Sequence, residues 1–304
     1  MAELQADDKF ARVVRKIDTQ GKLLRTWTLE GGVSAQVTAM EIERSDGHRQ
    51  KLIIRQHGEA DVSHRPQIAA DEFRLLQLLH AEGLAVPEPF LLDQSGEIFP
   101  TPYVAIAYVE GATEFTPADM GDFLYQFTAQ LVRIHNIDCA HLDVSFLPRQ
   151  AQRFAERLRD RPASVDESLD EGHIRDVLEA VWSLPQRNPP ALLHGDYWLG
   201  NLLWRDGQLV AVIDWEDAAI GDPLFDIANS RLELLWAFGS DAMQDFTRRY
   251  QAMTVVDFTD LPYWDLCAAL RAMKFSTWAG DREQIIRERY QWFVSQAFAN
   301  LSAR

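Results

Sequence analysis

Three polar side chains in the second half of the chain, Asp196, Asn201 and Asp214, have the types and spacing that suit metal-assisted chemistry on a phosphate. Four residues separate Asp196 from Asn201. Asp214 follows a predicted hairpin whose turn contains Asp206 and Gly207, a typical turn pair. All three groups are therefore expected at the edges of one hairpin. Phosphoryl transfer from ATP needs such a set, because one carboxylate accepts the proton of the attacking hydroxyl while a second carboxylate and an amide oxygen hold Mg²⁺.

The residues around these groups repeat a known pattern. The run His194-Gly195-Asp196 stands where protein kinases have His-Arg-Asp, and Ile-Asp-Trp-Glu at 213–216 stands where they have Asp-Phe-Gly. Gly-Asp-Pro at 221–223, followed by Asp226, belongs to the same pattern. An isolated His-Gly-Asp would be no more than a turn. The amide and the second carboxylate in register favour the functional interpretation.

With this pattern the chain resembles the aminoglycoside phosphotransferase and choline-kinase-like family, the small-molecule relatives of protein kinases. Recognisable motifs extend from about residue 24 to residue 226. The resemblance implies ATP and Mg²⁺ as cofactors, Asp196 as the catalytic base, and Asn201 and Asp214 as magnesium ligands. It also implies that the phosphoryl acceptor is a hydroxyl group on a small molecule.

Glycines near the amino terminus are expected to cover the nucleotide. Gly31, Gly32, Val33 and Ser34 connect two predicted strands. Glycine lets a backbone approach phosphates closely, and N–H groups of the loop then point at them. A Gly-Gly turn alone predicts only a hairpin, so the nucleotide-binding role follows from the resemblance.

A predicted strand, Lys51–Arg55, ends where kinases place a lysine that bridges the phosphates and a glutamate of the next helix. The resemblance assigns Arg55 to that position and Glu72 to the ion-pair partner. Arginine is permanently charged and can bind phosphate through two N–H groups. The alternative for Arg55 is a solvated charge at a strand end, and Lys51 is then the next candidate.

The segment Tyr103–Gly111 is predicted as a strand that ends in a turn. In the resemblance it corresponds to the hinge between two lobes, and the backbone of Ala107 and Val109 is expected to hydrogen-bond adenine. An ordinary buried strand would use the same residues, so this assignment depends on their order along the chain.

Four further residues have predicted roles around this site. His135 is expected to be a structural histidine in the core. Asp226 is expected either to cap the next helix or to brace the catalytic loop. Trp198 either forms a wall of the acceptor site or packs beneath the loop, and Glu216 is a candidate for a second magnesium ion.

Periodicity and the resemblance together predict an α+β protein with a two-lobed, protein-kinase-like fold. The amino-terminal lobe, residues 1–108, is expected to hold an antiparallel sheet and to bind the nucleotide. Residues 109–304 form a mainly helical lobe with the catalytic loop and the acceptor site. The predicted strands are Lys22–Leu29, Val37–Ile42, Lys51–Arg55 and Phe90–Leu92. The predicted helices are Asp8–Ile17, His64–Ala81, Asp119–Asn136, Arg149–Arg159, Asp170–Trp182, Leu224–Phe238, Asp241–Met253, Pro262–Trp278 and Arg282–Asn300.

The amino-acid composition argues against some classes of binding partner and indicates a cellular location. The formal net charge of −16 argues against nucleic acid and anionic membranes as partners. The amino-terminal residues are acidic and lack the apolar core of a secretory signal, and no long apolar run predicts a membrane span. Cys139 and Cys267 are interpreted as reduced core residues, so a cytoplasmic location is expected.

The predicted function is ATP-dependent transfer of a phosphate to an aminoglycoside-like or amino-alcohol acceptor. The acidic composition is compatible with a cationic acceptor, but many soluble enzymes are simply acidic. Homoserine, choline, methylthioribose and macrolides remain open as acceptors, because a fold does not select among them. A silent, kinase-like binding protein would be expected to lack Asp196, Asn201 or Asp214. A protein kinase would have a long activation segment, which this chain lacks.

Overall fold

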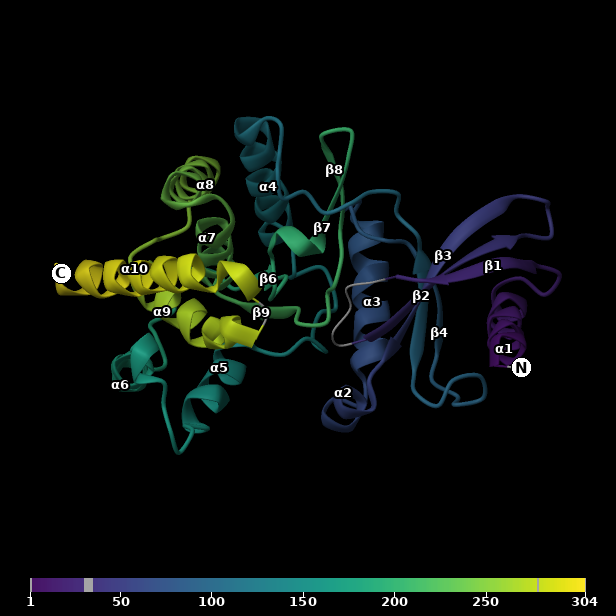
Figure 1. The fold of residues 1–304 in the computed structure, drawn as a ribbon, viewed down its shortest axis with the longest axis horizontal. Coiled ribbons are helices and arrows are strands. Elements are labelled where there is room, and N and C mark those ends of the chain that lie inside the picture. The colour runs from purple at the N-terminus through teal and green to yellow at the C-terminus, as the bar shows by residue number, and fades with distance from the viewer. Residues whose placement is uncertain (1, 30–34, 278, 304) are drawn as a thin grey trace. The chain divides into compact units, whose positions relative to one another are not determined.

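The computed structural model describes residues 2–29, 35–277 and 279–303 (Figure 1). The chain forms two compact units. The sheet unit consists of residues 1–111 together with the later segment 210–216, and the helical unit consists of residues 112–209 and 217–304. An antiparallel sheet in one unit and mostly helices in the other agree with the predicted fold class.

The sheet unit is built on five strands in the order β1-β2-β3-β5-β4, and all neighbours are antiparallel. The strands are β1 (Lys22–Thr28), β2 (Ala35–Glu43), β3 (Arg49–His57), β4 (Pro89–Asp93) and β5 (Tyr103–Ala107). β2 and β3 pair without irregularity along their whole length, which places Arg55 opposite Val37. Arg55 therefore lies inside the sheet, between β2 and β5, rather than at its margin.

Two helices pack on this sheet, α1 (Ala2–Ile17) and α3 (Ile68–Ala81), and Figure 1 shows them on either side of the strands. Val13 and Val14 of α1 join a buried apolar cluster that includes Leu52 and Ile54 of β3. Because side chains alternate along a strand, Arg55 points to the opposite face. On that face α3 contacts β4 and β5.

The predicted helix His64–Ala81 is wrong at its start. The structure has a short helix, α2 (Glu59–His64), and then α3, which begins at Ile68. Pro66 explains the interruption, because a proline disfavours the helical conformation of the residue before it. Arg65 accordingly has φ −134° and ψ 80°.

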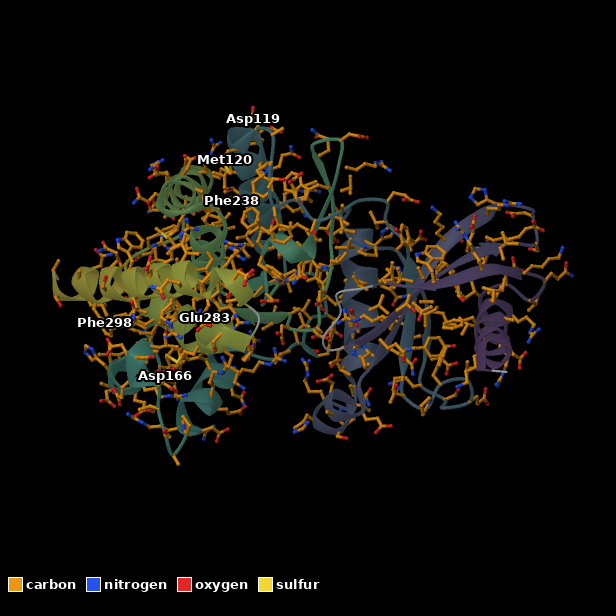
Figure 2. The ribbon with its side chains drawn as sticks, in the orientation of Figure 1. Asp119, Met120, Asp166, Phe238, Glu283 and Phe298 are labelled. Atoms are coloured by element: carbon orange, nitrogen blue, oxygen red, sulfur yellow. The ribbon has the colours of Figure 1, made fainter. Side chains whose placement is uncertain are left out.

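The helical unit is organised around α7, which contacts α8, α9 and α10. Its α-helices are α4 (Met120–His135), α5 (Gln150–Arg159), α6 (Glu171–Val181), α7 (Leu224–Phe238), α8 (Ser240–Met253), α9 (Leu261–Ala272) and α10 (Glu283–Ser302). The side chain of Asp119 caps α4 by accepting a 3.0 Å hydrogen bond from the backbone N–H of Asp122. Figure 2 shows Asp119 and Met120 at this end of the helix.

The hairpin predicted from the Asp-Gly pair is present. It joins β7 (Leu202–Arg205) to β8 (Gln208–Val212). Asp206 and Gly207 have φ values of 52° and 74°. Positive φ at both central residues is the geometry of a type I′ turn, whose twist matches that of the two strands.

Two features of the helical unit differ from the prediction. The predicted helix Pro262–Trp278 ends earlier, because α9 stops at Ala272 and the chain continues as a 3₁₀ helix over Met273–Thr277. Trp278 itself lies outside the described residues. A short strand that was not predicted, β9 (Ala219–Gly221), pairs antiparallel with β6 (Ala191–Leu193). Three residues are too few to show a strand periodicity.

Across the described ranges, no helix has both the length and the apolar composition that a membrane span requires.

The sheet unit contains a buried carboxylate whose removal is expected to destabilise the fold. Asp93 of β4 accepts hydrogen bonds from Lys16 at 2.7 Å, from the Tyr103 hydroxyl at 3.0 Å and from the backbone of Ser95 at 2.8 Å. Burial alone would raise the pKa of Asp93, but these donors outweigh it and hold the pKa well below its ordinary value.

Asp93→Ala should lower the free energy of unfolding by about 2 kcal/mol, because it leaves the Tyr103 hydroxyl buried and unpaired. Tyr103→Phe, the control, removes one hydrogen bond and should cost about 1 kcal/mol. The stabilisation from Asp93 is present above the unfolded pKa, near 4, and is lost as the pH falls through the lower folded pKa. Urea titrations from pH 7 to pH 2 would show a steep decline for the wild type and a shallower one for Asp93→Ala. Parallel pH profiles would contradict the assignment.

Candidate active site

The His-Gly-Asp run follows directly on β6 in the helical unit and needs glycine at its centre. Gly195 has a φ of +86°, which other residues rarely adopt. A Cβ atom at this position would overlap the carbonyl oxygen of Asp217. The close approach brings the backbone at Asp217 against the loop and positions Asp196 at the end of a buried strand.

Asp226 of α7 braces this loop from within the core. Its carboxylate accepts the backbone N–H of His194 at 2.7 Å and that of Gly195 at 3.0 Å. Nε2 of His135 lies 3.2 Å from Oδ2 of Asp226, the same oxygen that accepts from His194, and Nδ1 of His135 lies 2.7 Å from the Tyr250 hydroxyl. Burial would raise the pKa of Asp226, but the hydrogen bond with His135 and the nearby N–H groups lower it below its ordinary value. Of the two predicted roles, bracing the loop is the one observed, and His135 is the expected core histidine.

Asp196 and Asn201 are joined by hydrogen bonds within the loop. Nδ2 of Asn201 donates to the backbone oxygen of Asp196 at 2.9 Å and to its carboxylate at 3.2 Å. Because the amide nitrogen faces Asp196, the amide oxygen of Asn201 is directed elsewhere. The Asp196 side chain remains 41% exposed, so the carboxylate is accessible to a substrate.

Trp198 lies on the loop itself. Its ring covers Gly200 so closely that a Cβ atom there would overlap the indole. The ring of Phe115, an exposed residue, lies 6.4 Å from it between centroids. The Trp198 ring therefore packs against the loop at Gly200. It also contacts the ring of Phe115 at the surface of the helical unit.

In the sheet unit, Arg55 is surrounded by carboxylates. Its Nη1 lies 2.8 Å from Glu72, and its Nη2 lies 2.8 Å from Asp214 and 2.5 Å from Glu216. The Arg55 side chain is 9% exposed. Burial would lower the pKa of Arg55, but the three carboxylates raise it above its ordinary value. Arg55 thus contacts Glu72, the partner expected from the sequence, while a phosphate-binding role of the pair stays a prediction.

The segment that carries Asp214 is held in an unusual conformation. Asp214 has a φ of 65°, in the left-handed region that aspartate tolerates better than most residues. Two hydrogen bonds fix the chain on either side, from Val212 N–H to the oxygen of Ala85 at 2.7 Å and from Arg65 to the oxygen of Glu216 at 2.8 Å. The Asp214 side chain is 35% exposed, so part of its carboxylate remains open to a ligand.

The other predicted nucleotide contacts are only partly described. Gly31, Gly32, Val33 and Ser34 lie outside the described residues. At the predicted hinge, the N–H of Ala107 donates to Glu88 at 2.8 Å. The N–H of Val109 has no partner in the described part of the chain. Of the two N–H groups predicted to contact adenine, it is therefore the better placed.

Lys51, the other candidate for the position of the kinase lysine, has a different partner from Arg55. Lys51 forms an ion pair with Glu110 at 2.6 Å, and its side chain is 36% exposed. Glu72 therefore pairs with Arg55 and not with Lys51.

Arg65 and Arg271 are among the residues near the predicted site that were not found from the sequence. Arg65 holds the Asp214 segment, and Arg271 of α9 has its Nη2 3.9 Å from the Asp196 carboxylate. Neither belongs to a recognised motif, and α9 follows the loop by more than fifty residues. Only the tertiary structure brings Arg271 to Asp196.

A sheet unit with a buried Arg–Glu pair and a helical unit with a braced His-Gly-Asp loop define a protein-kinase-like phosphotransferase. The model of the phosphotransferase enzyme family matches residues 29–271, and the chain belongs to this family.

Comparisons with known proteins found similar sequences and similar solved structures. Acyl-CoA dehydrogenase family member 10 of Mus musculus is 28% identical over 177 residues, which are 53% of this chain and 16% of the mouse protein. The chain therefore spans only a small part of that relative. A putative aminoglycoside phosphotransferase from Ralstonia eutropha has a TM-score of 0.68 and 14% identity, with 97% of this chain and 98% of that chain covered.

A second solved structure is the ternary complex of a thermostable aminoglycoside phosphotransferase mutant with AMP-PNP and hygromycin B. It has a TM-score of 0.64 and 16% identity, and the alignment covers 95% of this chain and 97% of that one. Both structures confirm the predicted kinase-like fold.

Asp226→Ala should lower the free energy of unfolding by about 3 kcal/mol, because two buried N–H groups lose their acceptor. Asp226→Asn keeps the volume and one acceptor oxygen, so it should cost less in stability. Both variants should lose phosphotransferase activity, since the loop that carries Asp196 is no longer held. Asp241→Ala, on the surface of α8, is the control. Urea denaturation with unchanged midpoints for both Asp226 variants would show that the brace contributes nothing.

Arg55 and Glu72 should behave as a coupled pair. Arg55→Ala removes the arginine partner of buried Glu72 and leaves only His57, whose Nε2 lies 2.9 Å away. The double variant Arg55→Ala, Glu72→Ala should therefore lose less than the sum of the single losses. A coupling energy of about 1–3 kcal/mol is expected in urea denaturation, and the same cycle should be run on nucleotide affinity. Lys51→Ala, which removes an exposed pair, should be close to wild type. Additive effects on nucleotide affinity would limit the pair to a structural role.

Proposed function

We propose that the protein transfers the γ-phosphoryl group of ATP to a hydroxyl of a small molecule, with Asp196 as the base. The observation that carries this proposal is the accessible Asp196 carboxylate on a loop held by two hydrogen bonds to a buried aspartate. A general base must be held in place and still be reached by the substrate. Asp196 meets both requirements.

Magnesium fits the residues assigned to it. Asp214 is a partly exposed carboxylate, and the amide oxygen of Asn201 is directed away from the loop contacts that its nitrogen makes. Oxygen ligands of this kind suit Mg²⁺, which commonly uses only one or two protein groups together with phosphates. Within the described residues no three His, Cys, Asp or Glu side chains form a metal cluster. Bound magnesium would neutralise charge on the phosphates.

The sheet unit supplies the residues proposed for the nucleotide. Arg55 would contact the α- and β-phosphates, and Glu72 would hold its guanidinium, as expected of the lysine–glutamate pair of kinases. A nucleotide phosphate would compete with Asp214 and Glu216 for Nη2 of Arg55. Gly31, Gly32, Val33 and Ser34 would cover the phosphates, and the backbone of Ala107 and Val109 would contact adenine. The solved complex with AMP-PNP supports a nucleotide site in this fold.

For the acceptor, an aminoglycoside-like or amino-alcohol compound follows from the family resemblance. The hygromycin B complex supports a small molecule with a hydroxyl group as acceptor. A screen with γ-labelled ATP over aminoglycosides, amino alcohols, homoserine and macrolides tests this directly.

Measured with an acceptor from this screen, Asp196→Ala should lower kcat by about 10²- to 10⁴-fold and leave nucleotide binding nearly unchanged. Asp214→Ala should instead lose magnesium-dependent nucleotide binding, measured by calorimetry with and without Mg²⁺. Asp241→Ala serves again as the surface control. Full activity of Asp196→Ala on the true acceptor would refute the role of Asp196. Nucleotide binding that ignores both Mg²⁺ and the Asp214 substitution would refute the metal assignment.

A further inference from the structure

Two aromatic rings lie at the surface of the helical unit beside the proposed base. Trp198 follows Asp196 by two residues on the same loop, and the ring of Phe115 lies 6.4 Å from the indole between centroids, at an angle of 55°. Phe115 is 46% exposed, and Trp198 is partly buried. Two adjacent rings form a larger apolar area than one exposed side chain, and such areas mark binding sites in many proteins.

The loop directs Asp196 and Trp198 toward the surface. Tyr197 between them is fully buried, and its hydroxyl donates to the backbone oxygen of Phe127 at 2.9 Å. The backbone of Trp198 is extended, with φ −146° and ψ 172°. Neighbouring side chains of an extended chain point to opposite sides. The burial of Tyr197 therefore agrees with an outward direction of both flanking side chains, and the Asp196 side chain is 41% exposed.

Gly200 fixes the position of the Trp198 indole. A Cβ atom at this residue would overlap the six-membered ring of the indole, so the ring can rest on the loop only because residue 200 has no side chain. Gly200 is not among the glycines with positive φ. Space for the indole, and not an unusual backbone conformation, therefore explains this glycine. The indole is held against the loop that carries the proposed base.

Backbone contacts bring Phe115 to the same place. Ala112 and Trp204 exchange two backbone hydrogen bonds of 2.9 and 2.8 Å, which join the segment before α4 to strand β7. The carboxylate of Glu114 accepts the backbone N–H of Thr116 at 2.6 Å. These contacts fix the chain on both sides of Phe115 and leave its ring exposed.

Packing in the core of the same unit looks different. The rings of Phe123 and Trp204 lie 4.6 Å apart at an angle of 25°, and these residues are only 3% and 6% exposed. Phe115 and Trp198 are further apart, more tilted and open to solvent. Mutual packing therefore leaves apolar surface of this pair in water. Contact with a ligand ring would remove that surface from water, which is favourable.

We propose that Trp198 and Phe115 bind a ring of the acceptor, and that the hydroxyl presented to Asp196 is carried on that ring or on the carbon next to it. The inference rests on the proposed function and names the class of its acceptor, a ring-bearing alcohol. The C–H face of a sugar ring and the face of an aromatic ring both offer the apolar surface that an indole and a phenyl ring bind.

This site narrows the list of acceptors that the fold leaves open. Aminoglycosides, methylthioribose and macrolides carry sugar rings with hydroxyl groups. Homoserine and choline are acyclic and have no ring face to place on Trp198 and Phe115. The proposal therefore favours the first group over the second.

Matched amino alcohols test the proposal, with γ-labelled ATP as the donor. Glucosamine and its open-chain reduction product glucosaminitol carry the same groups with and without a sugar ring. In the aromatic pair, 2-amino-1-phenylethanol has a phenyl group where 1-amino-2-propanol has a methyl group. The ring-bearing member of at least one pair should have a kcat/KM about tenfold or more above its partner, because more apolar surface is buried. The pair that shows the preference distinguishes a sugar ring from an aromatic one.

Variants then locate the effect. Phe115→Ala should raise the KM of the preferred ring-bearing acceptor by about 5- to 30-fold, with kcat and the KM of ATP within about twofold of wild type. Phe115→Tyr keeps the ring and should restore the KM. Trp198→Phe keeps a smaller aromatic face and should raise the same KM by about two- to fivefold. Tyr125→Ala, which removes another exposed ring from α4, is the matched control and should change nothing. A fall in kcat for every acceptor in Phe115→Ala would mean a structural role and would overturn the proposal.

The inference and the proposed function can fail separately. Equal kcat/KM within both pairs, or an unchanged KM in Phe115→Ala, would overturn the ring site and leave the phosphotransferase function standing. If none of the four compounds is phosphorylated, saturation-transfer NMR with glucosamine and 2-amino-1-phenylethanol decides. Binding of either compound that Phe115→Ala weakens about fivefold or more, and that Tyr125→Ala leaves unchanged, supports the ring site alone. Absence of binding, or binding that Phe115→Ala does not weaken, overturns it.

Discussion

A single buried carboxylate, that of Asp226, holds together the part of the helical unit on which the rest of the candidate site depends. A charge without water is tolerated in a protein interior only when donors surround it. Here the donors are two backbone N–H groups of the His-Gly-Asp run, and His135 contacts the carboxylate oxygen that the N–H of His194 also reaches. The requirement to satisfy one charge therefore fixes the conformation of the loop. Helices α4 and α7 and strand β6 meet at this point.

The loop could be recognised from the sequence because its chemistry is local. The Asp-Gly turn, the interval from Asp196 to Asn201 and the alternation that turns Arg55 away from Leu52 all involve neighbours in the chain. The role of Asp226 remained open between two alternatives, since a helix cap and a loop brace use the same residue at the same position. Only the hydrogen bonds to the loop decide between them.

Other features depend on contacts that no local pattern contains. The break before α3 follows from Pro66. This proline is a local signal, but the prediction gave more weight to the apolar stripe of the helix. Arg271 approaches Asp196 from a helix far along the chain, and nothing in its neighbours marks it. In the sheet unit, three carboxylates surround Arg55, and two of them come from a segment far along the chain.

The return of residues 210–216 to the sheet unit has a consequence for synthesis on the ribosome. The five strands are complete once Ala107 has been made, but Asp214 and Glu216 follow about 100 residues later. At roughly 5–20 residues per second this interval lasts about 5–20 s. During that time Arg55 has Glu72 as its partner and lacks the other two carboxylates. The charge of Arg55 can therefore be neutralised in two stages, by Glu72 first and by Asp214 and Glu216 only after the segment 210–216 has been made.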